Sequence, residues 1–211
     1  MGLLLSDGFI REHYGKYFGI KLKKADKDVV LKVKKHLGYS GPIYYQKPET
    51  RIYPNGVTIN SSGNVMLKIC SAYTVDRLKS LGFSENKSLN EKFLDCIKDK
   101  DDEQICRNFI RGIFDGDGSI MFDKQRYSLC FQIVGPKGFL SDIQRYLIKY
   151  CNVRKTKLTQ NIKGKDHFAL RYRGNKQAIR ILRWMYKDAG YLTRMDRKYK
   201  KFLLVKKGLA K

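Results

Sequence analysis

The sequence predicts a mixed α/β fold, of the α+β class, made of two similar halves that each carry an antiparallel sheet. One short motif occurs twice, as GLLLSDGFI at residues 2–10 and as GIFDGDGSI at residues 112–120. The same order of expected strands and helices follows each copy. The length of 211 residues also suits two closely packed halves of about 100 residues each.

The expected strands alternate apolar and polar residues. Residues 17–24 place apolar side chains on one side and lysines on the other, and residues 127–134 show the same period. Such alternation is typical of a strand with one buried face. Later strands are expected at residues 65–70 and 167–174.

Helices are expected where apolar residues recur at helical spacing. In each half one helix follows the first strand, and another follows the later strand, at residues 74–81 and 176–186. A helix over residues 105–114 precedes the second motif, and Asp101 or Asp102 can cap its start. The helix after the first strand is marked by Val29, Val30, Val33 and Leu37 in one half and by Phe139, Leu140, Ile143 and Leu147 in the other.

The order in each half is therefore helix, strands, helix, strands, helix. The predicted domains are an N-terminal half, residues 1–88, and a C-terminal half, residues 103–211, joined by a polar and charged connection at residues 89–102. Basic residues on the outward side of the strands indicate a surface that reads the groove of a nucleic acid.

Charge predicts the class of partner. Lys and Arg total 44 against 20 Asp and Glu, which gives a formal charge of +24 spread through both halves. Such a charge binds phosphates through counterion release and opposes self-association, so a polyanion is expected. No apolar run approaches the roughly 20 residues needed to span a bilayer, so a membrane partner is not expected.

The remaining composition excludes several kinds of site. Five cysteines without CxxC spacing are expected to be reduced, buried packing residues, neither a disulfide framework nor a zinc site. The three histidines share no ligand spacing. Residues 1–5 are too short for the apolar core of a secretion signal, so we expect a cytoplasmic, nucleoid-associated protein or one of an organellar matrix.

The duplicated motif carries the chemistry. Asp117 is expected at the C-terminal tip of its helix, where the helix dipole disfavours a negative charge, and Asp7 is its equivalent in the first copy. Two such tips side by side repel each other unless they share a divalent metal. Gly112 inside a helix costs about 1 kcal/mol relative to Ala, which indicates the close approach of another backbone, as at Gly2. A site built from two equivalent halves suits duplex DNA, which is itself nearly twofold symmetric.

Three other interpretations explain the motif less well. The run from Asp115 begins like a calcium loop, but Ile120 and Arg126 stand where such a loop needs Gly and Glu. The glycines form neither GxGxxG nor GxxxxGK[ST], which excludes a nucleotide cradle. An ordinary turn after a buried helix explains one copy alone. The second copy and its matching downstream elements disfavour that explanation.

The two motifs also resemble those of a known family. IRGIFDGDG at residues 110–118 aligns without a gap with the nine-residue motif of the LAGLIDADG homing endonucleases, and GLLLSDG at residues 2–8 aligns with its last seven positions. The resemblance extends over nearly the whole chain and is to the single-chain, two-motif form. It implies two pseudo-twofold αββαββα halves, with the motif helices at the central interface and two saddle-shaped antiparallel sheets in the major groove of a long DNA site.

The resemblance implies a monomeric enzyme that cuts double-stranded DNA at a specific site. Asp7 and Asp117 would be its catalytic acids and would bind Mg²⁺, which Mn²⁺ can replace, each acid serving one strand. The backbone carbonyls of Ser6 and Gly116 are implied as additional metal ligands.

Basic residues are implied near the scissile phosphates and along the strands. Lys87 and Lys198 match the family's basic segments and would stabilise transition-state charge, with a solvated surface lysine as the alternative for each. The residues expected to contact DNA bases or phosphates are Lys21, Lys23, Lys24, Lys68, Gln132, Lys155, Lys157, Arg171 and Arg173.

The first motif departs from the family pattern. It starts almost at Met1, so its helix is shortened or the natural chain begins earlier, and Leu5 stands where the family motif has an acid. At the strand-end position where several members place a water-positioning glutamine, this chain has Lys24 and Gly135. A non-cleaving nucleic-acid binder on the same fold, such as a group I intron RNA maturase or a DNA-binding regulator, is the alternative function. Retention of both motif acids favours cleavage, and intron RNA stays possible as an additional partner.

Overall fold

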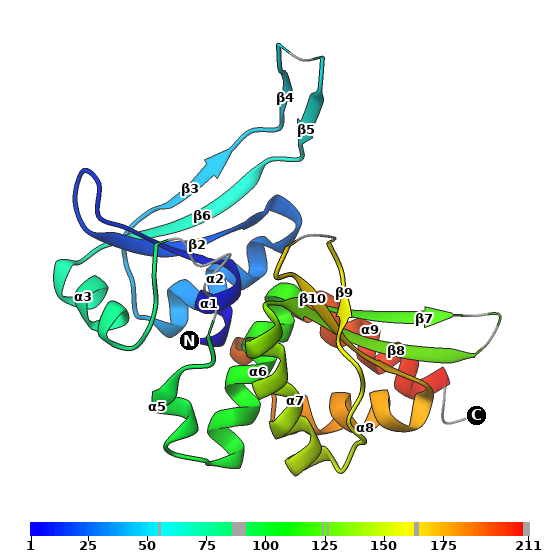
Figure 1. The fold of residues 1–211 in the computed structure, drawn as a ribbon. Helices are drawn as coiled ribbons and strands as arrows, with labels where there is room; N and C mark the ends of the chain where they lie inside the picture. The colour runs from blue at the N-terminus through cyan, green and yellow to red at the C-terminus, as the bar shows by residue number, and fades with distance from the viewer. Residues whose placement is uncertain (55, 86–91, 124, 126, 163–164, 209–211) are drawn as a thin grey trace.

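Two four-stranded antiparallel sheets form the frame of the molecule (Figure 1). The computed structural model describes residues 1–208 except 55, 86–91, 124, 126 and 163–164. The strands of the first sheet are β1 (Gly8–Arg11), β2 (Tyr17–Lys23), β3 (Ile43–Gln46) and β6 (Asn64–Cys70). Those of the second are β7 (Gly118–Asp123), β8 (Ser128–Gly135), β9 (Thr159–Gln160) and β10 (Phe168–Arg173).

The two sheets have the same connectivity. Their strand orders are β1-β2-β6-β3 and β7-β8-β10-β9, and every neighbouring pair is antiparallel. The alternation predicted for β8 is complete, since every second residue of that strand is buried. The predicted α+β class is confirmed, and the common strand order is consistent with the predicted pseudo-twofold relation.

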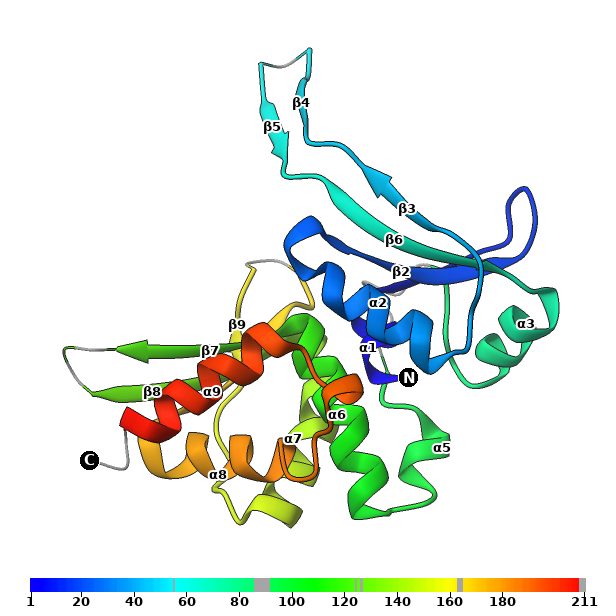
Figure 2. The ribbon, with the colours of Figure 1, turned by 180° about the vertical axis from the view of Figure 1, so that it is seen from behind.

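Helices separate and cover the two sheets (Figures 1 and 2). In the first half they are α1 (Gly2–Asp7), the short η1 (Lys24–Asp26), α2 (Lys27–His36) and α3 (Ala72–Ser80). In the second half they are α6 (Glu103–Asp117), α7 (Lys137–Cys151), α8 (Asn175–Met185), the short η2 (Tyr191–Thr193) and α9 (Asp196–Gly208). Helix α2 packs on β2 and β6, while α7, α8 and α9 pack on the second sheet. The order of elements predicted for each half is therefore observed.

The motif helices α1 and α6 pack backbone to backbone. A methyl group built on Gly2 would lie 2.0 Å from the carbonyl oxygen of Phe109, and one built on Gly112 would lie 2.6 Å from the amide nitrogen of Leu3. Only glycine allows this approach, which is the reason for the costly Gly112 inside α6. The predicted packing of the two motif helices is thus present at the centre of the molecule.

The ends of α6 follow from its sequence. The carboxylate of Asp102 accepts a hydrogen bond from the amide of Ile105 at 2.8 Å, as a side-chain cap does. The helix ends at Asp117, and Gly118 continues as extended chain. Helix α6 has 15 residues, whereas α1 has six, so the first motif helix is short.

Two segments differ from a simple duplication. A hairpin of β4 (Glu49–Ile52) and β5 (Thr58–Ser61) extends well beyond the first sheet (Figure 1). In the second half, β9 is the counterpart of β3 and has only two residues, and the described residues between β9 and β10 form no strand. The predicted connection, residues 89–102, contains a short helix, α5 (Asp95–Lys98), and buries Phe93, Leu94 and Ile97 in the core. The boundaries of the two halves stay a prediction.

The cysteines are less uniform than predicted. Cys106 and Cys151 are buried, but Cys70 at the end of β6 is exposed, because its side chain points away from the buried face of the sheet. No helix in the described ranges is long and apolar enough to cross a membrane.

Candidate metal centre and nucleic-acid interface

The C-terminal ends of α1 and α6 meet between the two sheets. A methyl group built on Gly116 would lie 2.1 Å from Ser6 Oγ and 2.6 Å from Asp7 Oδ2. Asp117 is the next residue, and both acids are half-buried. The structure therefore brings together the four residues that the sequence predicted as acids or metal ligands.

Lys198 of α9 lies at the end of α6. Its ammonium group donates hydrogen bonds to the carbonyl oxygens of Phe114 at 2.6 Å, Asp115 at 2.8 Å and Gly116 at 3.0 Å. The side chain is buried, and burial lowers the pKa of Lys198 to about 8. The last carbonyls of a helix favour a cation. Lys198 thus offsets the unfavourable end of the α6 dipole beside Asp117.

The hydrogen bonds of Lys198 affect the role predicted for it, which was to stabilise charge near a scissile phosphate. An ammonium group has three N–H donors, and three carbonyl oxygens of α6 lie within reach of them. Lys198 therefore acts on the site through the end of α6, and its role near a scissile phosphate stays a prediction. Lys87, the matching prediction in the first half, lies outside the described residues.

Asp115 is a buried acid to which the sequence analysis gave no role. Its Oδ2 accepts a hydrogen bond from the amide of Met195 at 2.9 Å, and the hydroxyl of Tyr186 lies 3.5 Å from its Oδ1. Burial raises the pKa of Asp115 to about 6, and the Met195 hydrogen bond partly opposes that shift. Asp115 holds the start of α9 onto α6. The sequence does carry a sign of this role: Asp115 is an acid, whereas the equivalent position of the first motif is the apolar Leu5.

Two cavities border Asp7. One, of about 360 Å³, lies between the end of β2 and the start of α9; the other, of about 530 Å³, lies over the first sheet. Their common lining residues are Asp7 and Lys21. The acid is therefore open toward a basic sheet surface, as a phosphate-binding site requires. Arg11 also lines the second cavity, and the sequence analysis did not single it out.

The basic residues predicted on the first sheet share one face. Lys21 and Lys23 are exposed on β2, and Lys68 of β6 lies with its ammonium 4.0 Å from the centre of the Tyr17 ring. Lys68 is opposite Gly19 in the register, two residues from Lys21 on the same side of β2. Lys24 is exposed at the start of η1, next to this face.

The second sheet presents an ordered polar face. Arg171 of β10 lies opposite Gln132 of β8 and donates to its Oε1 at 2.6 Å and to Thr159 Oγ1 at 2.5 Å. Arg173 is exposed two residues farther along the strand. Lys155 and Lys157 are exposed in the segment before β9, where the Thr156 hydroxyl donates to the Arg171 carbonyl at 3.0 Å. All the predicted contact residues thus lie on or beside the two sheets.

The donor set suits a metal whose coordination is completed by a substrate. The described residues contain no cluster of three or more His, Cys, Asp and Glu side chains that could hold a metal ion. Mg²⁺ commonly binds through one or two carboxylates plus substrate phosphates and waters. Asp7 and Asp117 beside a basic surface fit that pattern.

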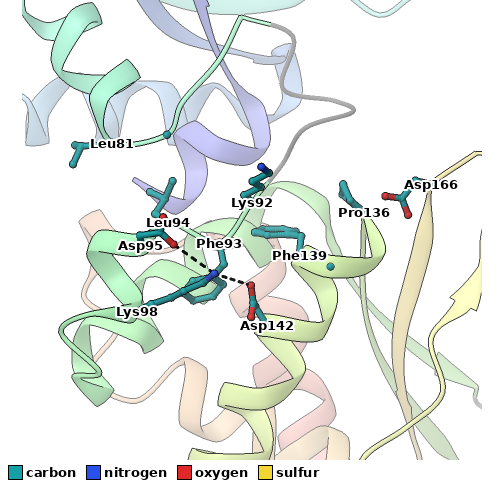
Figure 3. A pocket seen from close by; sticks show the side chains of 12 residues that line it. Leu81, Lys92, Phe93, Leu94, Asp95, Lys98, Pro136, Phe139, Asp142 and Asp166 are labelled. Atoms are coloured by element: carbon teal, nitrogen blue, oxygen red, sulfur yellow. Dashed lines mark ion pairs between the residues drawn. The ribbon is translucent and has the colours of Figure 1, made fainter.

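A larger cavity, of about 550 Å³, lies apart from both acids, between the α5 segment and the start of α7 (Figure 3). Phe93 and Phe139 line it, and Lys98 forms ion pairs there with Asp95 at 3.6 Å and Asp142 at 3.2 Å. We assign this cavity no function.

The sequence matches no protein-family model and no curated protein. The fold, in contrast, is found in solved structures. The I-LtrWI LAGLIDADG homing endonuclease bound to target DNA is 13% identical, with a TM-score of 0.57 over 100% of this chain and 89% of that one. The homing endonuclease I-WcaI bound to its DNA recognition sequence is 12% identical, with a TM-score of 0.57 over 95% of this chain and 82% of that one. The N-terminal LAGLIDADG domain of WhiA is 16% identical, with a TM-score of 0.50 over 90% of this chain and 79% of that one. The resemblance seen in the two motifs is thus confirmed in three dimensions: the chain has the LAGLIDADG fold.

Proposed function

We propose that this protein is a site-specific DNA endonuclease that binds a long duplex target as a monomer and hydrolyses both strands with Mg²⁺. The observation that carries the proposal is the meeting of two acid-bearing helix ends, Asp7 and Asp117, between two sheets with basic outward faces. The DNA complexes of I-LtrWI and I-WcaI, which share the fold, support a nucleic-acid substrate.

Each group at the centre has a role in this proposal. Asp7 and Asp117 would hold the metal, with the backbone oxygens of Ser6 and Gly116 as further ligands. The Gly116 oxygen accepts a hydrogen bond from Lys198, and a carbonyl has a second lone pair for another partner. A bound Mg²⁺ lowers the pKa of a water molecule and stabilises the oxygen that leaves phosphorus, and Mn²⁺ can replace it.

The chain supplies position and charge. Lys198 holds the last turn of α6, and therefore the backbone on which Asp117 is mounted. Lys87 is proposed to supply charge near the second phosphate. Basic residues on both sheets would neutralise phosphates on either side of the cut, so that the duplex lies across both halves.

The test uses DNA in which the sequences flanking the gene are joined without the inserted gene. Purified protein is expected to cut this DNA on both strands in Mg²⁺ or Mn²⁺ and to leave it intact in EDTA. A scrambled duplex of equal length is the control. Binding to the joined DNA without cleavage in either metal would contradict the enzyme proposal.

A non-cleaving nucleic-acid binder, such as an intron RNA maturase or a DNA-binding regulator, is the second candidate. The observation that favours it is the Lys198 ammonium on the Gly116 carbonyl, because a cation of the chain already uses one lone pair of an expected metal ligand. Tight binding of the joined duplex or of the intron RNA at fixed salt, together with no cleavage, would support this candidate, and the preferred nucleic acid would separate the regulator from the maturase.

Lys21 provides a test of the sheet surface. Lys21→Gln is expected to reduce the slope of log binding constant against log salt by about 1, since one phosphate contact is lost. Lys35→Gln is the matched control, because Lys35 is an exposed lysine of α2, which packs on the opposite face of the sheet. Binding of a fluorescent duplex at several salt concentrations measures both slopes. Identical slopes for the two variants would remove Lys21 from the interface.

A further inference from the structure

Several contacts hold the two halves together. The acids Asp7 and Asp117 belong to different halves, so their separation depends on how the halves are placed. Helices α1 and α6 pack against each other, and first-half residues such as Val75 and Leu78 share a hydrophobic cluster with residues of the second half. A further set of contacts lies next to the acids themselves.

Residues 191–198, which comprise η2 and the start of α9, make such contacts; we call them the inter-half segment. In Figure 2 this part of the chain runs beside α2 of the first half. Met195 of the segment is only 2% exposed and belongs to the smaller of two hydrophobic clusters. The other buried members of that cluster are all in the first half: Ile20, Leu22, Val29, Val30, Val65 and Leu67. A side chain of the second half is thus buried among residues of the first.

Ion pairs flank Met195 on both sides of the contact. Arg197 binds the Asp26 carboxylate with two hydrogen bonds, from Nε at 3.0 Å and from Nη2 at 3.2 Å. The paired guanidinium and carboxylate resist rotation better than a single hydrogen bond. Asp26 belongs to η1, immediately after the end of β2.

Lys32 of α2 makes the second ionic contact. It is 3% exposed, and its ammonium lies 2.9 Å from Asp196 Oδ2 and donates to the carbonyl of Arg194 at 3.1 Å. It also lies 4.2 Å from the centre of the Tyr191 ring. A buried ammonium with partners this specific permits little displacement of the segment across α2.

The same eight residues are tied to the catalytic end of α6. The amide of Met195 donates to Asp115, and Lys198 donates to three α6 carbonyls, including that of Gly116. One short segment therefore contacts the first half on one side and the backbone next to Asp117 on the other.

We propose that the inter-half segment fixes the first half relative to the end of α6 and so positions Asp7 against Asp117, which makes Lys32 and Arg197 positioning residues. The catalytic part of this inference rests on the proposed endonuclease function, while the placement of the halves does not. Lys32 is buried and acts only through the separation of the two acids, whereas Arg197 also lines the cavity beside Asp7. The distance between the halves, and not cleavage alone, therefore tests the positioning role.

The variants are Arg197→Ala, Lys32→Met and the double variant, with Arg197→Lys as the conservative change. The Arg197 side chain is 62% exposed, so its removal creates no cavity and lets water reach the buried Asp26. Arg197→Ala should therefore fold even if Lys32→Met does not. Lys98→Ala is the matched control, because Lys98 also pairs with two carboxylates but does not contact the first half through them (Figure 3).

Two measurements separate positioning from stability. The first is the distance distribution between spin labels on exposed sites of the two halves, Tyr73→Cys and Arg183→Cys. The background for labelling replaces the accessible cysteines Cys70, Cys96 and Cys130 with Ser. The second is single-turnover cleavage at saturating protein, alongside duplex affinity without metal and the melting temperature.

The double variant is expected to broaden the distance distribution and to slow single-turnover cleavage by roughly 10- to 100-fold, with little change in duplex affinity. Arg197→Ala should show the same change to a smaller degree, and Arg197→Lys a still smaller one, because lysine keeps the charge but loses the second hydrogen bond. Lys98→Ala should resemble the wild type. An unchanged distribution in both Arg197→Ala and the double variant would overturn the proposal. If the wild type does not cleave but the distributions broaden, the endonuclease function fails and the placement role stands.

Discussion

Asp117→Asn is expected to lower single-turnover cleavage of at least one DNA strand by about a thousandfold or more, and Asp7→Asn should do the same. Asparagine keeps the shape of the side chain but removes the charge that would hold the metal, and each factor of ten in rate corresponds to about 1.4 kcal/mol of transition-state stabilisation. Since the two acids lie at the ends of α1 and α6 in contact, neither can replace the other without a shift of a helix.

Labelling each strand separately makes this prediction precise. If each acid serves one strand, each variant should cut one strand slowly, and the slow strand should differ between the two variants. If both acids share one metal, each variant should cut both strands slowly. Duplex affinity without metal should be retained or increased, because a negative charge next to phosphates is removed. Asp99→Asn is the control, because it removes the same charge at an exposed position. Asp99 follows α5, which lies beside the larger cavity and apart from both acids. Cleavage of both strands at the wild-type rate by Asp117→Asn would refute the assignment.

Gly112→Ala is expected to lower the free energy of unfolding by about 2 kcal/mol or more, as overpacking does when backbone must move. In an ordinary helix the same change would stabilise by up to about 1 kcal/mol, so the sign itself is informative. The added methyl group would lie 2.6 Å from the Leu3 amide nitrogen and 3.0 Å from two backbone atoms of Gly2. Helix α1 must therefore shift, and Asp7 at its end would shift with it.

Gly138→Ala is the matched control for this change. Gly138 lies in the first turn of α7, and a methyl group there would meet no atom within 4 Å. Denaturant unfolding of the two variants should therefore give opposite signs, and cleavage should fall only for Gly112→Ala. Equal stability of both variants would show that the α1 and α6 backbones are not in contact in solution.

The local pattern of apolar and polar residues was sufficient to predict most helices and strands of the fold. The alternation over residues 127–134 predicted β8 to within one residue at each end, and Asp102 proved to be the cap of α6. These features depend on neighbours in sequence, which is why pattern alone locates them. The β4 and β5 hairpin gave no such pattern, because it extends beyond the sheet and exposes Ile52, Val57 and Ile59 instead of burying one face.

The roles of individual charged residues were harder to predict. Lys198 was recognised as a basic residue near the site, but the sequence does not reveal that its ammonium is buried against three carbonyls of α6. Asp115 was visible as an acid in the motif, yet its partner, the Met195 amide, lies far along the chain. Contacts of this kind depend on burial and on packing between distant segments, which no local period encodes.

The sequence by itself determined that one motif occurs twice, that each copy ends a helix with an acid, and that a polyanion is the expected partner, since repeats, periodicity and net charge are properties of the chain alone. Only the tertiary structure decided that Gly116 lies against Ser6 and Asp7, that Lys198 offsets the end of α6, and that Met195 is buried among residues of the other half. These contacts join segments that are far apart in the sequence. Their geometry follows from how two helices cross and how two cores pack, and that is set only when the whole chain has folded.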